Sequence, residues 1–172
     1  DLAGKPISVF ESGAILQYLG RKFGRFYPQD ERTRVQVDEW LFWQMANLGP
    51  VSGHGNHFRN YAPEKVPYAI DRYTREVSRL YGVLNKQLEG RDYICGAYSI
   101  ADMACYPWIV PHERQGQNLD DFPHLKRWFH EIRERPATQR AYARAKEINT
   151  QATVTEEARK ILFGQTAKVV KT

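Results

Sequence analysis

An acidic residue and a hydroxyl stand side by side where a strand-like run, residues 6–10, gives way to a helical pattern. Glu11 and Ser12 therefore lie at a predicted helix N-terminus, which presents free backbone N–H groups and a partial positive charge. A ligand carboxylate binds well there, the Ser12 hydroxyl adds a hydrogen-bond donor, and the Glu11 carboxylate accepts from an ammonium group. The pair suits an amino-acid head group. The alternative is an ordinary helix start that Ser12 caps.

Three more polar side chains, His54, Asn56 and His57, lie in a glycine-containing stretch that we predict to be a long loop over residues 51–66. A His-x-x-His spacing can supply two metal ligands, but no cysteine or acid at suitable spacing completes the site, so no metal is predicted. Neither histidine has an obvious serine or cysteine partner for nucleophilic catalysis. We expect the three side chains to form a polar wall beside a ligand cleft.

Arg72 stands on a predicted helix that starts at Pro67, two positions beyond the apolar Ile70. This places it toward the edge of the helix rather than in its buried stripe. From spacing alone, the simplest expectation is a surface ion pair with Asp71 or Glu76.

Ser99 and Asp102 stand three residues apart, directly before a run that is almost wholly apolar. That spacing predicts a structural capping box, with Asp102 in the position that Glu usually takes. The helix that follows should be central and buried, because it is apolar on nearly every side.

The elements that carry these residues are predicted to be mostly helical, because apolar residues recur at helical spacing. The expected helices cover residues 30–47, 67–89, 99–110, 122–135 and 137–147. Gly49-Pro50 is expected to end the first of them. Near the C-terminus, the segment EEARKILFG could form one or two helical turns against a partner surface.

The first 27 residues read as turn, strand and helix. A single strand cannot form a sheet, because its backbone groups need neighbours, so we expect this segment to be the end of an α/β domain whose earlier part is absent. The predicted organisation is a remnant of that domain over residues 1–27, an all-α domain over residues 28–147 and a tail over residues 148–172.

Net charge, hydropathy and cysteine content restrict the classes of partner and the compartment that we expect for the chain. The net charge is +5, but basic residues are interleaved with acids along the predicted helices, so we read them as solvated surface and predict no nucleic-acid partner. No apolar run is long enough to span a membrane, so we predict no membrane partner either. Cys95 and Cys105 lack metal-site spacing and fit a reducing cytoplasm.

Several segments together resemble the cytosolic glutathione transferases. They are PISVFESGAILQYLG, SIADMACYPW and FPHLKRWFHEIRERPATQRA. The stretch over residues 49–90, which includes PYAIDRY, is similar to the nu class and its disulfide-bond reductases. The resemblance extends over about residues 6–145.

This resemblance implies a thioredoxin-like domain that binds glutathione and an all-α domain that supplies the second wall of the site. It implies a homodimer that uses glutathione as co-substrate. Glu11 and Ser12 take the role of recognising the γ-glutamyl group, and Arg72 takes that of contacting a second glutathione. The expected fold is therefore mainly α, an all-α bundle of the transferase type preceded by the last strand and helix of a thioredoxin-like domain.

The chain departs from the family pattern in one respect: the earlier strands and helices of the thioredoxin-like domain are missing from it. In the nu-like proteins the residue that activates the glutathione sulfur lies in that part, so the resemblance assigns no catalytic residue to this chain. The resemblance implies a glutathione-dependent oxidoreductase that acts on small disulfides. The alternatives are conjugation of glutathione to electrophiles and a non-catalytic protein-assembly module.

Overall fold

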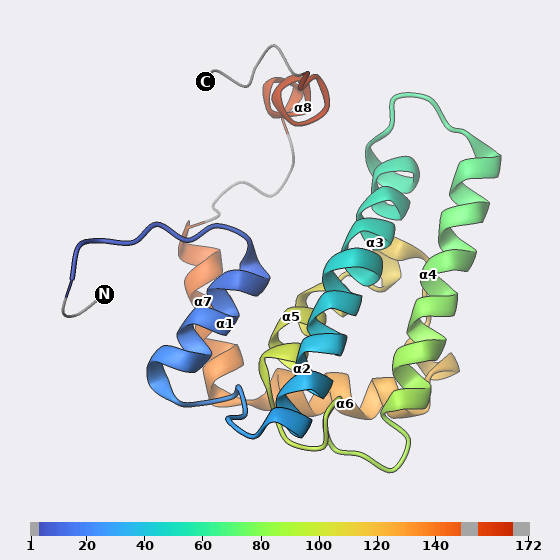
Figure 1. Ribbon diagram of the computed structural model, residues 1–172. Helices are drawn as coiled ribbons and strands as arrows, with labels where there is room; N and C mark the ends of the chain where they lie inside the picture. The colour runs from blue at the N-terminus through green and yellow to red at the C-terminus, as the bar shows by residue number, and fades with distance from the viewer. Residues whose placement is uncertain (1–3, 149–154, 167–172) are drawn as a thin grey trace. The chain divides into compact units, whose positions relative to one another are not determined.

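The computed structural model describes residues 4–148 and 155–166 (Figure 1). The chain divides into two compact units, residues 1–132 and 133–172, each of which is described by itself. Every regular element among the described residues is helical, so the expectation of a mainly α fold is confirmed. No helix in those two described ranges is long and apolar enough to cross a membrane.

The first helix, α1 (Ser12–Phe23), packs against α5 (Ile100–Ile109). The strand that we predicted over residues 6–10 is not formed, and Ile7 and Phe10 are 58% and 81% exposed. A strand needs a neighbour that pairs with its backbone N–H and C=O groups. No described segment pairs with these residues, so the chain before α1 is extended but irregular.

A continuous helical rod follows, and it replaces much of the predicted loop. Its segments are α2 (Glu31–Trp43), the π-helix η1 (Gln44–Leu48), α3 (Gly49–Asn56) and the π-helix η2 (His57–Tyr61). Asp30 caps the rod by accepting a 2.9 Å hydrogen bond from the backbone N–H of Thr33. The loop prediction is therefore wrong for residues 51–61, and Gly49-Pro50 does not end the helix.

The glycines and the proline have a different role from the one we predicted. Pro50 lies in the first turn of α3, directly after the π-helix η1, so the rod continues through a residue that cannot donate a backbone hydrogen bond. The glycines are points of close approach between helices. A Cβ atom on Gly49 would lie 3.3 Å from the Trp108 ring, and one on Gly55 would lie 3.5 Å from Val77.

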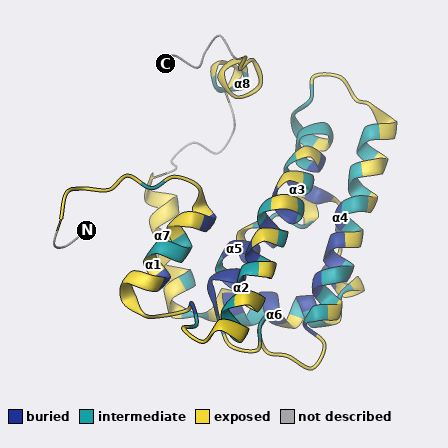
Figure 2. Ribbon diagram, in the orientation of Figure 1, coloured by how far each residue is buried: buried dark blue, intermediate teal, exposed yellow. Residues whose placement is uncertain are grey.

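The other helices of the first unit complete a bundle around α5. Helix α4 (Pro67–Gln87) lies beside α3 in Figure 1, and α6 (Pro123–Glu134) reaches the boundary between the units. Two short 3₁₀ turns, η3 (Glu113–Gln115) and η4 (Leu119–Asp121), connect α5 to α6. Figure 2 shows the buried residues gathered on the facing sides of these helices. Fully buried large side chains include Leu41, Leu48, Leu80, Tyr81, Leu84, Ile109, Leu125, Trp128 and Ile132.

The predicted capping box is confirmed at the start of α5. Ser99 Oγ accepts from the backbone N–H of Ala101, and the Ser99 N–H donates to Asp102 at 2.9 Å. The other carboxylate oxygen of Asp102 accepts from the backbone N–H of Ile94 at 3.0 Å and from the Trp128 indole at 2.8 Å. Burial raises the pKa of Asp102, while these hydrogen bonds oppose the rise by stabilising the carboxylate.

The second unit contains α7 (Pro136–Ile148) and α8 (Glu156–Phe163), which confirms helices in both predicted places. Thr155 caps α8 by accepting a 3.1 Å hydrogen bond from the backbone N–H of Ala158. A partner surface for α8 stays a prediction, as do the domain boundaries after residues 27 and 147.

Two glycine substitutions test how closely α1 packs. A Cβ atom on Gly20 would lie 2.6 Å from the Cβ atom of Tyr27, so Gly20→Ala is expected to lower the free energy of unfolding by about 1–3 kcal/mol through overpacking. The matched control is Gly82→Ala within α4, where a Cβ atom meets nothing within 4 Å. There, alanine is expected to stabilise by about 0.5–1 kcal/mol. Urea unfolding measures the free energy of unfolding of both variants. Equal changes for Gly20→Ala and Gly82→Ala would contradict the close packing of α1.

Candidate functional site

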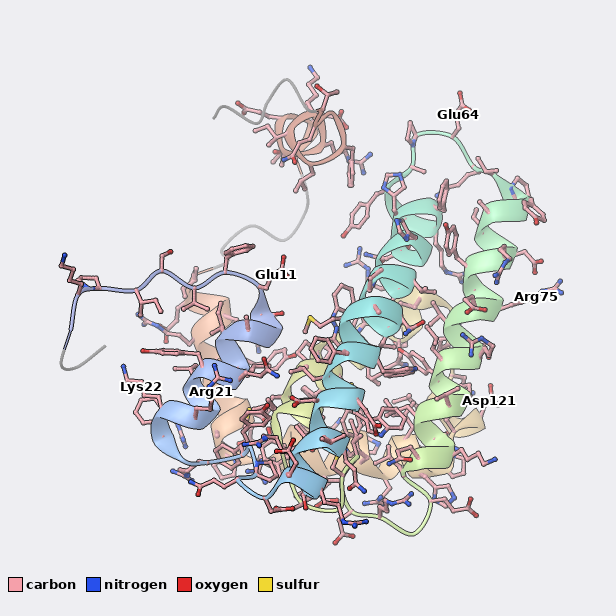
Figure 3. All side chains as sticks on the ribbon, viewed as in Figure 1. Glu11, Arg21, Lys22, Glu64, Arg75 and Asp121 are labelled. Atoms are coloured by element: carbon pink, nitrogen blue, oxygen red, sulfur yellow. The ribbon has the colours of Figure 1, made fainter. Side chains whose placement is uncertain are left out.

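The predicted head-group pair lies at the first turn of α1, where Figure 3 labels Glu11. Glu11 is the N-cap residue, with φ of 67° and ψ of 120°, a conformation that residues other than glycine rarely adopt. Such strain costs on the order of 1–3 kcal/mol and is most often found at binding and active sites. No described residue forms an ion pair with the exposed Glu11 carboxylate.

Ser12 does not cap the helix, so the alternative of an ordinary capped start is not what the structure shows. The first hydrogen bond of the helix joins the Ile15 N–H to the Glu11 carbonyl at 3.0 Å. The backbone N–H groups of Ser12, Gly13 and Ala14 therefore have no partner within the helix. Together with the Ser12 hydroxyl, they form a group of donors that suits a carboxylate.

Helix α1 is tied to α2 by a polar network at its middle. Gln17 Nε2 donates to Asp38 Oδ1 at 2.7 Å, and the Tyr27 hydroxyl donates to the same carboxylate at 2.9 Å. Burial raises the pKa of Tyr27, and its hydrogen bond to Asp38 raises it further. The network attaches the middle of α1 to α2.

Arg72 lies on α4 with 57% of its side chain exposed. Its guanidinium group contacts Glu76 at 3.2 Å, so the predicted ion pair is found with Glu76, while Asp71 pairs with Arg75 instead. Glu76 also accepts from Arg79 at 2.6 Å. The hydrogen bonds from Arg79 and Arg72 lower the pKa of Glu76 to about 2, so Glu76 stays ionised at neutral pH.

The structure does not bring Arg72 together with Glu11 and Ser12. Figure 1 shows the α2–α3 rod between α1, which carries the pair, and α4, which carries Arg72. Within the described chain they are two separate polar sites.

His54, Asn56 and His57 lie in helices rather than in the predicted loop. The His54 ring packs against Tyr73 with centroids 5.5 Å apart. Asn56 Oδ1 accepts a 2.6 Å hydrogen bond from Asn60. No group of three or more histidine, cysteine or acidic side chains that could hold a metal occurs among the residues that the structure describes. A ligand-facing role for these three residues stays a prediction.

Neither cysteine offers a thiolate. Burial raises the pKa of Cys95 to about 12, and complete burial also raises the pKa of Cys105 well above its usual value. A thiol must lose its proton to act as a nucleophile. Both cysteines are therefore protonated and weakly nucleophilic at neutral pH.

The sequence did not indicate that Met45 lies beside Ser12. Its thioether sulfur lies 4.0 Å from Ser12 Oγ, and its terminal methyl group would be 3.3 Å from a Cβ atom on Gly13. Met45 belongs to the π-helix η1, which the apolar spacing did not predict. A methionine 33 positions away from the serine carries no sequence signal for this contact.

Comparison with known proteins connects these features to one family. The family described as glutathione S-transferase, C-terminal domain, matches residues 56–136. The disulfide-bond oxidoreductase YfcG of Escherichia coli is 49% identical over 143 residues, which cover 83% of this chain and 66% of YfcG. The glutathione S-transferase-like protein tpcF of Aspergillus fumigatus is 31% identical over 155 residues, which cover 80% of this chain and 69% of tpcF.

Solved structures with bound ligands are similar as well. A glutathione transferase from Burkholderia graminis, with two glutathione molecules bound per subunit, is 39% identical with a TM-score of 0.75, over 80% of this chain and 61% of that one. A glutathione transferase from Pseudomonas putida, with one glutathione disulfide bound per subunit, is 39% identical with a TM-score of 0.75, over 79% and 62%. The chain thus spans under two thirds of the length of YfcG and of these two proteins. These matches, together with the helical bundle and its capping box, show that the chain belongs to the glutathione S-transferase family.

Proposed function

We propose that the protein is a glutathione-dependent disulfide-bond oxidoreductase that acts on small disulfides. The observation that carries the proposal is the strained Glu11 beside Ser12, at a helix N-terminus whose donors have no partner within the helix. Backbone strain at a ligand-facing position is the kind of cost that a binding function offsets. The similarity to YfcG and to a transferase that binds glutathione disulfide supports this reaction class.

The head group of glutathione fits the pair by charge and by hydrogen-bond direction. Its γ-glutamyl carboxylate would accept from the Ser12 hydroxyl and from the free N–H groups of the first turn of α1. Its ammonium group would donate to the Glu11 carboxylate. A charged ligand that forms both contacts is bound more tightly, and in a more defined orientation, than one that forms only the first.

The chemistry is thiol–disulfide exchange. A glutathione thiolate attacks one sulfur of the substrate disulfide, so that a mixed disulfide forms and a substrate thiolate leaves. A second glutathione thiolate then attacks the glutathione sulfur of the mixed disulfide, which yields glutathione disulfide and the second substrate thiol. Two glutathiones are oxidised and one disulfide is reduced, with no protein cysteine involved. This agrees with the raised pKa of Cys95 and the burial of Cys105.

Arg72 would hold a carboxylate of the second glutathione. Arg72→Ala is therefore expected to weaken the binding of glutathione disulfide about tenfold, and that of one reduced glutathione much less, because a charge-assisted hydrogen bond is lost. Titration calorimetry with both ligands measures the difference. Arg75→Ala is the control on the same helix, because it removes an exposed arginine with a similar i,i+4 ion pair to which no ligand contact is assigned. Equal losses for both ligands would contradict this role.

The reaction class is tested by comparing the rates of a small disulfide and an aryl halide with glutathione. Faster turnover of the disulfide is expected. Faster conjugation of the aryl halide would favour the conventional transferase activity, for which Trp43, Tyr61 and Trp108 are candidate pocket residues. Binding of a stoichiometric protein partner without any affinity for glutathione would favour an assembly module. The resemblance further supports a homodimer in the cytoplasm, which sedimentation analysis and fractionation test.

A further inference from the structure

The Ser12 hydroxyl has an unusual partner. Within the described part of the chain its one hydrogen-bond partner is the thioether sulfur of Met45, at 4.0 Å. A thioether is a weak acceptor, whereas a carboxylate is a strong one. A ligand carboxylate can therefore replace this partner at little cost. If the partner were an amide or a carboxylate of the protein, the ligand would have to break a strong hydrogen bond first.

Met45 is held in this place from both sides. It belongs to the π-helix η1 (Gln44–Leu48), whose extra residue per turn directs side chains differently from a regular α-helix. On the other side is Gly13, which is buried. A Cβ atom there would lie 3.3–3.5 Å from the Cε, Sδ and Cγ atoms of Met45, so the whole end of the methionine lies along the first turn of α1.

We propose that Met45 is a positioning residue for the glutathione head group, an inference that rests on the proposed function. It keeps the Ser12 hydroxyl in one orientation through a contact weak enough for the ligand carboxylate to displace. The specific requirement is an apolar or weakly accepting end of the side chain at position 45. A strong acceptor of the same length would compete with the ligand for the hydroxyl proton.

The test compares Met45→Gln with Met45→Leu. Glutamine has nearly the shape of methionine but ends in an amide, and leucine keeps the position apolar. We expect Met45→Gln to weaken glutathione binding about tenfold, the size of one charge-assisted hydrogen bond, and Met45→Leu to weaken it about twofold. Met103→Leu, a change on α5, serves as a control for methionine replacement. Calorimetry gives the affinities, and thermal unfolding shows whether the fold is kept.

A second pair of variants separates positioning from packing. In a Ser12→Ala background there is no hydroxyl to compete for, so the additional loss caused by Met45→Gln is expected to disappear. An additional tenfold loss that persists in that background would overturn the inference, as would equal affinities of Met45→Gln and Met45→Leu. If the unchanged protein shows no affinity for glutathione, the proposed function itself fails, and that result differs visibly from the other two.

Discussion

Replacing Asp102 by alanine is expected to lower the free energy of unfolding by about 3–5 kcal/mol, the largest effect of any single substitution discussed for this chain. The side chain is completely buried and accepts hydrogen bonds from the backbone of Ile94 and Ser99 and from the Trp128 indole. Alanine leaves these donors buried without partners. It also removes half of the capping box that begins α5, the helix around which the bundle forms.

Urea unfolding followed by tryptophan fluorescence measures this loss. Asp102→Asn is the informative companion, because it keeps the volume and one accepting oxygen but places an NH₂ group among donors. Its free energy of unfolding should lie between that of Asp102→Ala and that of the unchanged protein. The control is Asp120→Ala, where an exposed carboxylate pairs with Lys126 at the surface and little change is expected. A loss below about 1 kcal/mol for Asp102→Ala would mean that water or another side chain satisfies the donors.

Glu11→Gln is expected to weaken glutathione binding about 10- to 100-fold, since it removes the charge that pairs with the ligand ammonium. The fold should be unaffected, because Glu11 is exposed and no described residue forms an ion pair with it. The measurement is calorimetric titration of both proteins with glutathione. Glu89→Gln, another exposed acid, controls for the change in net charge.

An N-acetylated glutathione sharpens this prediction, because it keeps the carboxylate and lacks the ammonium group. The unchanged protein should bind it much more weakly than glutathione, whereas Glu11→Gln should bind both with similar affinity. If Glu11→Gln still discriminates between the two ligands, another group recognises the ammonium. The role of Glu11 would then be limited to the geometry of the turn.

Much of the bundle could be predicted from the sequence, because its signals are local. The apolar stripe of α4 and the three-residue spacing of Ser99 and Asp102 each depend on a single stretch of chain, and the structure confirms both. The strand over residues 6–10 could not form, since its stability depends on neighbours that the described chain does not supply. The loop prediction over residues 51–61 was wrong because Gly49-Pro50 and the glycines that follow suggested a helix end. In the structure, Gly49 and Gly55 pack closely against distant side chains, and the helix continues despite their poor helix propensity.

The candidate site could be predicted only where the residues are adjacent. Glu11 and Ser12 could be proposed from the sequence because they are neighbours at a predicted helix start, and the structure places them at the first turn of α1. Met45 could not, because its contact with Ser12 joins two helices far apart in the sequence. Helix spacing predicted an ion pair of Arg72 with Asp71 or Glu76, and the structure shows the one with Glu76. The three-way link of Gln17, Tyr27 and Asp38 could not be predicted in this way, because it depends on how α1 meets α2.

The two π-helices of the α2–α3 rod, η1 and η2, determine how each segment of the rod is rotated about the helix axis relative to the next. An α-helix advances about 100° with each residue, so one residue more or fewer rotates everything beyond it by nearly a third of a turn. In this rod, η1 separates α2, which packs against α5, from α3, whose Gly55 lies against α4. A one-residue deletion within η1 would leave the helix intact yet turn one segment away from its partner.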